Sequence, residues 1–230
     1  MLVAFISDVH GNLPALEAVV EKLEACDEIY CCGDVVGYYP FPNEVVELLI
    51  SLDVKSVLGN HDYAVLTNDF TGFNSIAREA GVWTVKHISD RSLDYLAELP
   101  FSIKTELFEI YHGMPGEGLE SLFEYVFPED DLEYLIDDRS VVVGHSHIQF
   151  VRWFNSLNSQ LDPFYPLFFL NPGSVGQPRD GDPRAAYALL DTESWKVKLE
   201  RTKYNIEEVC EAVEKAGLPD FLCERLYRGV

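Results

Sequence analysis

Residues 2–12 read LVAFISDVHGN, and this stretch decides the fold class. Residues 2–7 form an apolar run of the length of a buried strand. Asp8, His10 and a glycine follow it at once. Pro14 then stands where the first turn of a helix tolerates proline, and apolar residues recur at helical spacing over 16–23. The stretch therefore predicts a strand, a loop that carries reactive side chains, and a helix.

The same strand–loop–helix order continues along the chain. Residues 28–32 (EIYCC) and 55–58 (KSVL) predict two more strands, and 42–52 predict a second helix. This alternation implies parallel pairing with right-handed crossovers. We expect further helices over 74–88, 90–99, 128–138 and 206–216, a hairpin over 101–112, and strands within 140–144, 149–155, 162–171, 184–192 and 195–204. With no internal repeat or linker, the sequence predicts one α/β domain over residues 1–230.

The charge of the chain limits its partners. It has 17 Lys and Arg against 39 Asp and Glu, a formal net charge of −22. Such a surface repels nucleic-acid backbones and anionic membranes, so we expect neither long nucleic acid nor a membrane as partner. No apolar run is long enough to span a membrane, and the amino terminus reads as a strand rather than a signal peptide. A homo-oligomer is left open.

The cysteines indicate the compartment. There are five, an odd number in a chain too large to be a disulfide scaffold. We therefore expect a reducing environment, and hence a cytoplasmic protein.

Polar side chains follow strand after strand. The candidates are Asp8, His10, Asp34, Asn60, His61, Asp62, His112, His145 and His147, all just past the carboxyl end of an expected strand. Binding crevices form at that edge of open α/β sheets, so these loops should meet there.

The residue types point to metal chemistry. Carboxylate, amide oxygen and imidazole suit divalent Mn, Fe, Zn, Ni or Co, and Mn is the ion we expect. Seven side chains, without His61 and Asp62, are too many for one ion with open positions and suit two ions that share a carboxylate. Two such ions clamp the attacking and leaving oxygens of an in-line displacement, with a bridging hydroxide as nucleophile. They would also supply the positive charge that this acidic chain lacks.

The neighbours of the expected ligands have their own expected roles. His145 and His147 lie two residues apart at a strand exit, so both can face the ions. His61 follows Asn60 directly and should point elsewhere, where it can protonate the leaving group. We expect Asp62 to orient the His61 ring and keep it protonated. Gly33, Gly59 and Gly144 should relieve crowding where backbone approaches the ions.

The ordered motifs SDVHGN, CCGDVVG, LGNHDY, HGMPG and GHSH resemble those of the calcineurin-like metallophosphoesterase superfamily. The likeness is strongest to its small prokaryotic branch of phosphodiesterase and diadenosine tetraphosphatase-like proteins, and it covers about residues 1–203. It implies a four-layer sandwich of two mixed sheets flanked by helices. It also implies that Asp8, His10 and His147 hold one metal, that Asn60, His112 and His145 hold the other, that Asp34 bridges them, and that His61 is catalytic. Tyr39 stands where glycine is more usual and is expected to narrow the cleft.

The sequence therefore predicts a phosphoesterase that hydrolyses a small phosphodiester, nucleotide or phosphomonoester. Arg179 is a candidate to bind the substrate phosphate, because guanidinium matches phosphate geometry. The alternative is that it forms an ion pair within its loop. Asn12 is a second phosphate candidate, although a helix cap is the favoured interpretation. The alternative function is a catalytically weak relative of the fold that acts as a protein-interaction scaffold. The presence of His61 and every ligand favours the enzyme.

Overall fold

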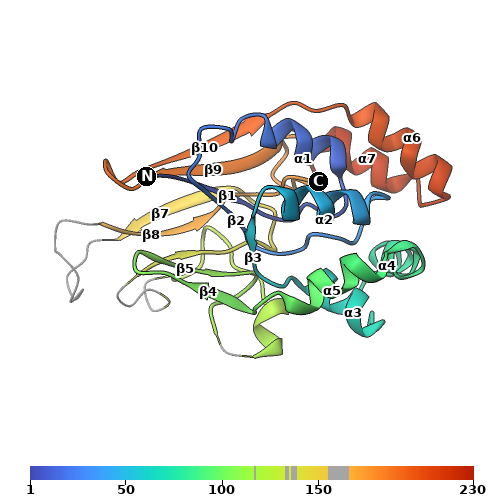
Figure 1. Ribbon diagram of the computed structural model, residues 1–230, viewed down its shortest axis with the longest axis horizontal. Coiled ribbons are helices and arrows are strands. Elements are labelled where there is room, and N and C mark those ends of the chain that lie inside the picture. The colour runs from blue at the N-terminus through green and yellow to red at the C-terminus, as the bar shows by residue number, and fades with distance from the viewer. Residues whose placement is uncertain (117, 133–134, 136–138, 155–165) are drawn as a thin grey trace.

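The computed structural model describes residues 1–116, 118–132, 135, 139–154 and 166–230. Their strands form two five-stranded sheets, of order β10-β9-β1-β2-β3 and β4-β5-β6-β8-β7. Figure 1 shows the sheets one above the other, with helices along them. The expected architecture of two mixed sheets flanked by helices is confirmed.

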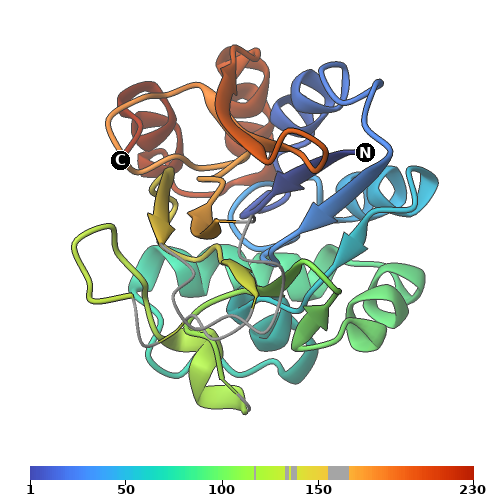
Figure 2. The same cartoon turned by 90° about the vertical axis from the view of Figure 1, so that its left-hand side faces the viewer.

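The first sheet joins the two ends of the chain. It consists of β1 (Leu2–Ile6), β2 (Glu28–Cys31), β3 (Lys55–Ser56), β9 (Ala185–Asp191) and β10 (Lys196–Thr202). β1, β2 and β3 are parallel, as the strand–helix alternation predicts, whereas β9 runs antiparallel to β1 and to β10. In Figure 2 the blue and the orange-red parts of the chain share one half of the molecule, and the green middle occupies the other.

The second sheet comes from the middle of the chain. It consists of β4 (Ser102–Lys104), β5 (Phe108–Tyr111), β6 (Ser140–Val142), β7 (Phe150–Phe154) and β8 (Leu167–Asn171). The expected hairpin is the antiparallel pair β4–β5, and β5, β6 and β8 are parallel. The exits of β5 and β6 therefore lie side by side at one edge.

Alternation along β1 sorts its side chains into two cores. Val3 and Phe5 pack between the sheets, with Phe108 of β5 among their neighbours. Ala4 and Ile6 face the helices on the outer side of the first sheet. Because successive strand residues point to opposite faces, one strand contributes to both layers. β1 is thereby held rigidly, and with it the loop that carries Asp8 and His10.

The helices are α1 (Leu13–Val20), α2 (Pro42–Ser51), α3 (Asn60–Thr67), α4 (Ser75–His87), α5 (Asp90–Glu98), α6 (Ile206–Ala216) and α7 (Phe221–Arg228), with the 3-10 helix η1 (Leu119–Phe123). Asn205 caps α6 at its start, and Gly217 ends it in a left-handed conformation. Within the described residues, no helix combines the length and apolarity needed to cross a membrane.

Three parts of the fold differ from the sequence-based expectation. β3 is only two residues long, and α3 and α7 were not predicted. α3 buries polar side chains such as Asn60 and His61, so it shows no apolar stripe. The helix expected over 128–138 is not formed at 128–132, where the chain turns, and most of the remainder lies outside the described residues.

Candidate metal centre

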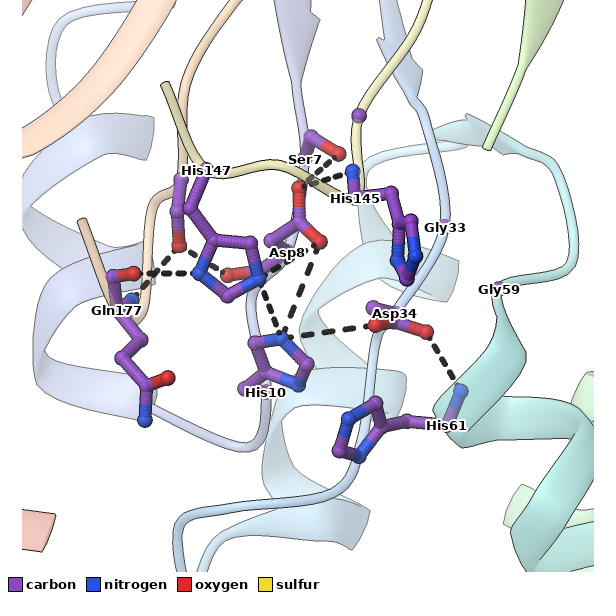
Figure 3. A network of polar contacts seen from close by, with 12 residues as sticks. Ser7, Asp8, His10, Gly33, Asp34, Gly59, His61, His145, His147 and Gln177 are labelled. Carbon is purple, nitrogen blue, oxygen red and sulfur yellow. Dashed lines mark hydrogen bonds and ion pairs between the residues drawn. The ribbon is translucent and has the colours of Figure 1, made fainter. Parts of the chain in front are cut away.

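The loops after the strands of the first sheet are bonded to one another. The N–H of Asp8 donates to the carbonyl of Gly33 at 3.0 Å, and that of His10 donates to the carbonyl of Asp34 at 2.9 Å. The loop after β6 joins them, since the N–H of His145 donates to Oδ2 of Asp8 at 3.1 Å. The two sheets therefore contribute to one cluster (Figure 3).

One group of donor atoms contains Asp8, His10 and His147. The Nε2 atoms of His10 and His147 are 3.1 Å apart, and Nε2 of His147 lies 3.2 Å from Oδ1 of Asp8. All three side chains are buried, and their donor atoms lie within 4.8 Å of one another. Figure 3 shows the three converging on one point.

A second group contains Asp34, His112 and His145, again with donor atoms within 4.8 Å of one another. Asn60 adjoins it, since its Oδ1 is 2.9 Å from Nε2 of His112. Asp34 connects the two groups: its Oδ2 lies 3.6 Å from Nε2 of His10 and 3.5 Å from Nε2 of His112. The structure thus brings together all seven side chains that the sequence singles out.

Backbone carbonyls fix which ring nitrogen faces the cluster. Nδ1 of His112 donates to the carbonyl of Cys32 at 2.7 Å, and Nδ1 of His147 donates to the carbonyl of Gln177 at 2.5 Å. Nδ1 of His10 is 3.2 Å from the carbonyl of Val36. With the proton on Nδ1, each Nε2 has a lone pair available for a metal ion. A hydrogen bond from the other ring nitrogen to a carbonyl is the usual support for a metal-binding imidazole.

The backbone at this cluster adopts an uncommon conformation. Five of the seven side chains sit at residues with positive φ: Asp8 (52°), His10 (53°), Asp34 (54°), His145 (64°) and His147 (59°). Such angles occur in only a few per cent of residues other than glycine. They turn the side chains at the strand exits inward, toward the cluster.

Gly33, Gly59 and Gly144 make room for the cluster, as the sequence predicts, and a Cβ at Gly33 would lie 2.9 Å from Nδ1 of His112. A Cβ at Gly59 would lie 2.1 Å from Oδ1 of Asp34, and one at Gly144 would lie 2.1 Å from Oγ of Ser7. Ser7 itself donates to Oδ2 of Asp8 at 2.6 Å. A side chain at any of these glycines would displace a member of the cluster.

The donor set fits divalent metal ions. Oδ1 of Asp8 and Nε2 of His145 are buried without a hydrogen-bond partner, a costly arrangement that a cation would relieve. Burial lowers the pKa of His10 and His145 well below the usual value and that of His147 to about 4, so these rings are neutral and able to ligate. Burial and the charges of Asp62 and Asp8 raise the pKa of Asp34, which marks a place for positive charge.

His61 lies beside the cluster and points into a cleft. Its ring centroid is 4.7 Å from that of His10, and its Nδ1 has no hydrogen-bond partner among the described residues. Burial, followed by the charge of Arg179, lowers its pKa, so the ring is neutral without substrate. Figure 3 shows it adjacent to Asp34.

Asp62 does not play the part expected of it. Its Oδ2 accepts from the N–H groups of Val35 at 3.2 Å and Gly59 at 3.0 Å, and its Oδ1 accepts from that of Val36 at 3.0 Å. The carboxylate therefore ties the Asp34 loop to the start of α3 and is not bonded to the His61 ring. Adjacent residues on a helix point in different directions, which explains the error.

Arg179 is the cation of the cleft. Its Nη2 donates to Oε1 of Gln177 at 2.9 Å and to the hydroxyl of Tyr38 at 3.3 Å. The loop ion pairs instead involve its neighbours, with Arg184 on Asp182 and Arg201 on Asp180. Arg179 is thus available to a ligand.

The helix-cap interpretation of Asn12 is confirmed, whereas its alternative phosphate role and the expected position of Tyr39 are wrong. Asn12 is fully buried, accepts from the N–H of Ala15 at 3.2 Å and donates to the carbonyl of Gly176 at 2.8 Å, so it caps α1 and cannot reach a phosphate. Tyr39 is also fully buried, and its hydroxyl donates to the carbonyl of Leu222 on α7 at 3.3 Å. Tyr38, not Tyr39, lines the cleft.

The cleft over the cluster has a volume of about 310 Å³. Its lining includes Asp34, Tyr38, Asn60, His61, Phe73, Phe123, Tyr125, His145, His147 and Arg179. The sequence analysis did not predict the contact of Gln177 with Arg179, nor the aromatic side chains Phe73, Phe123 and Tyr125 in the cleft lining. The only signal for Gln177 was its place in the NPGSVGQPRD segment.

The comparison with protein families agrees with this geometry. The model of the calcineurin-like phosphoesterase superfamily domain matches residues 1–195. The chain belongs to this superfamily. As a calcineurin-like phosphoesterase it is a metal-dependent hydrolase of phosphate esters, and the residue groups described above are its candidate metal ligands.

Other calcineurin-like phosphoesterases resemble the whole chain. The crystal structure of a metallophosphoesterase from Sphaerobacter thermophilus superposes with a TM-score of 0.86 at 36% identity, covering 100% of this chain and 99% of that one. An uncharacterized protein of Methanocaldococcus jannaschii is 39% identical over 99% of this chain and 98% of its own length. Phosphodiesterase YfcE of Escherichia coli is 26% identical over 84% of this chain and 89% of its own length.

Proposed function

We propose that the chain is a two-metal phosphoesterase, formed by one domain over residues 1–230, that hydrolyses a small phosphate ester. The observation that carries the proposal is the position of Asp34. One carboxylate oxygen lies between His10 of the first group and His112 of the second, at 3.6 and 3.5 Å. A carboxylate in that position can bridge two ions at the separation found in two-metal sites.

The ligand sets follow from the two groups. Asp8, His10 and His147 would hold one ion, and Asn60, His112 and His145 the other, with Asp34 shared between them. The mixture of nitrogen and oxygen donors suits Mn, with Fe, Zn, Ni and Co as alternatives. Two such ions, when bound, would supply positive charge to the phosphate oxygens and lower the pKa of an attacking water.

The side chains around the pair have separate tasks. Arg179 binds a phosphate oxygen through its guanidinium, which Gln177 and Tyr38 hold in the cleft. His61 donates a proton to the leaving oxygen. Because its pKa is lowered in the free protein, it acquires that proton when the negative charge of the substrate lies beside it.

A phosphodiester is the first substrate class to consider. YfcE, a relative over most of the chain, carries the name phosphodiesterase. The net charge of −22 disfavours long nucleic acids, and the cleft of about 310 Å³ fits a small molecule. A phosphomonoester is the alternative within the same chemistry. The intact cluster and the position of His61 in the cleft favour the enzyme over a scaffold.

The test combines metal content with turnover. Protein stripped with chelator and reloaded with Mn²⁺ should bind two ions per chain and hydrolyse bis(p-nitrophenyl) phosphate or p-nitrophenyl phosphate. Asp34→Ala should lose both the second ion and the activity, whereas His87→Ala, on the exposed side of α4, should lose neither. Binding of a single ion, or full activity of Asp34→Ala, would contradict the proposal.

A further inference from the structure

The cleft has aromatic side chains on both sides of the proposed metal pair. Phe73 contacts His61, with ring centroids 4.8 Å apart, next to the His10 group. Tyr125 stacks on His145 at 3.9 Å, next to the His112 group. Phe123 lines the same cleft. A ligand bound at the metal pair would therefore have aromatic side chains on two sides.

Two of these rings are unusually open to solvent. Phe123 is 39% exposed and Tyr125 is 46% exposed, although both border a site whose candidate metal ligands are almost fully buried. Exposed apolar rings that edge a pocket gain free energy when a ligand covers them. Beside Phe73 the cleft is open, because a Cβ at Gly72 would meet no heavy atom within 4 Å.

The charges of the cleft are sparse. Among its lining residues in the described part of the chain, Arg179 is the one permanent cation and Asp34 the one carboxylate. In a chain with 39 acidic residues, this leaves the walls nearly uncharged. The cleft can therefore hold the scissile phosphate at the metals and Arg179, but beyond it offers rings rather than ionic contacts.

We propose that the cleft selects phosphodiesters in which the ester group that stays on phosphorus carries a planar aromatic ring, such as a nucleobase or an aryl group, and that Phe123 and Phe73 stack on that ring. The inference rests on the proposed function and specifies its substrate class. A ring between these side chains replaces water on apolar surface and gains stacking contacts, while its phosphate remains at the metal pair. A diester of the same charge that retains a small alkyl group on phosphorus lacks both gains.

The test compares two diesters with one leaving group. Phenyl p-nitrophenyl phosphate and methyl p-nitrophenyl phosphate both release p-nitrophenolate, so they differ only in the group that stays on phosphorus. With the Mn²⁺-loaded protein, kcat/KM should favour the phenyl diester at least about five-fold, the lower range of one stacked ring. Phe123→Leu or Phe73→Leu should reduce this ratio toward one.

Matched variants separate stacking from folding. Phe123→Tyr keeps a ring and should keep the ratio. Phe101→Leu, at a phenylalanine of similar exposure that does not line the cleft, should also keep it. Equal kcat/KM for the two diesters in the unmodified protein would overturn the inference, as would ratios unchanged by both Phe123→Leu and Phe73→Leu.

A binding measurement distinguishes this inference from the function on which it rests. Calorimetry of phenyl phosphate and methyl phosphate with the Mn²⁺-loaded protein should show at least about five-fold tighter binding of the phenyl compound. If neither diester is hydrolysed but phenyl phosphate binds selectively through Phe123, the two-metal hydrolysis fails and the ring selectivity stands. If both diesters are hydrolysed equally and both phosphates bind equally, only the ring selectivity fails.

Discussion

The main-chain N–H of His61 donates a 2.8 Å hydrogen bond to Oδ1 of Asp34. The proposed general acid thus holds the proposed bridging ligand through its backbone, while its side chain points into the cleft. Any substitution at this position other than proline keeps the N–H. The two roles of the residue can therefore be separated by changing the ring alone.

Replacing His61 with alanine should remove proton donation without removing metal. We expect kcat to fall by about 10²–10⁴-fold, the usual contribution of a positioned acid, with two ions still bound per chain. Metal analysis and steady-state kinetics on the same preparation measure both quantities. The ring is buried against His10 and Phe73, so its removal also costs some stability, which a urea titration of the same variant measures separately. A variant that retains full kcat, or one that loses an ion, would show that the role is wrong.

Replacing His145 with alanine should remove one ion of the pair. Its Nε2 has no hydrogen-bond partner among the described residues, so the main loss is that of a ligand. We expect about one Mn²⁺ per chain instead of two by plasma mass spectrometry after dialysis. His87→Ala is the matched control, since that ring stacks on Trp83 away from the cluster. Two tightly bound ions in His145→Ala would remove this residue from the ligand set.

Removing metal should lower the thermal stability. An ion held at a concentration 100 times its Kd stabilises the fold by about 2.7 kcal/mol, which in a chain of this size corresponds to roughly 5–10 °C in Tm. Scanning calorimetry with and without chelator checks this shift. The shift should disappear in a variant that lacks both Asp8 and Asp34. An equal chelator effect in that variant would place the stabilising ion elsewhere.

Asp62→Asn should destabilise the fold rather than alter the acid–base step. The carboxylate accepts from three backbone N–H groups, and an amide places its own N–H₂ against one of them. We expect a loss on the order of 2–3 kcal/mol in the free energy of unfolding, measured with urea. Asp69→Asn, at an exposed turn residue, should change it by about 0.5 kcal/mol or less. A pH profile of kcat shifted by Asp62→Asn would instead support the orienting role expected from sequence.

Arg179→Gln should weaken substrate binding. Among the described residues, the hydrogen-bond partners of the guanidinium are the neutral Gln177 and Tyr38, so its charge can pair with a phosphate. We expect KM to rise about ten-fold or more, as for the loss of one charge-assisted hydrogen bond, with a smaller change in kcat. Arg184→Gln, whose side chain pairs with Asp182, should leave KM unchanged. If Arg179→Gln left KM unchanged and Arg184→Gln raised it, Arg179 would not bind the substrate and would serve only the structure of its loop.

The positions of the seven cluster residues could be predicted because each depends on short-range patterns. The parallel order of strands within each sheet places Asp8 at the edge of the first sheet and His145 at the edge of the second. That the two edges meet depends on how the sheets pack against each other. The role of Asp62 could not be predicted, because two of the three N–H groups that bind its carboxylate belong to Val35 and Val36 in another loop. The direction of Tyr39 depends on α7, which carries no signal near residue 39. Phe123 and Tyr125 lie in a segment without helical or strand periodicity, so the cleft wall was also missed.

The residues with left-handed backbone conformation at the cluster limit how far the thermal stability of this protein can be raised without loss of activity. Each non-glycine residue held at positive φ costs of order 1 kcal/mol, and five lie together here. Selection for heat resistance alone would favour glycine at such positions, since it relaxes the chain there. Each such glycine would also remove a candidate metal ligand. Directed evolution that selects for thermal stability without an activity screen should therefore yield variants that are more stable but inactive.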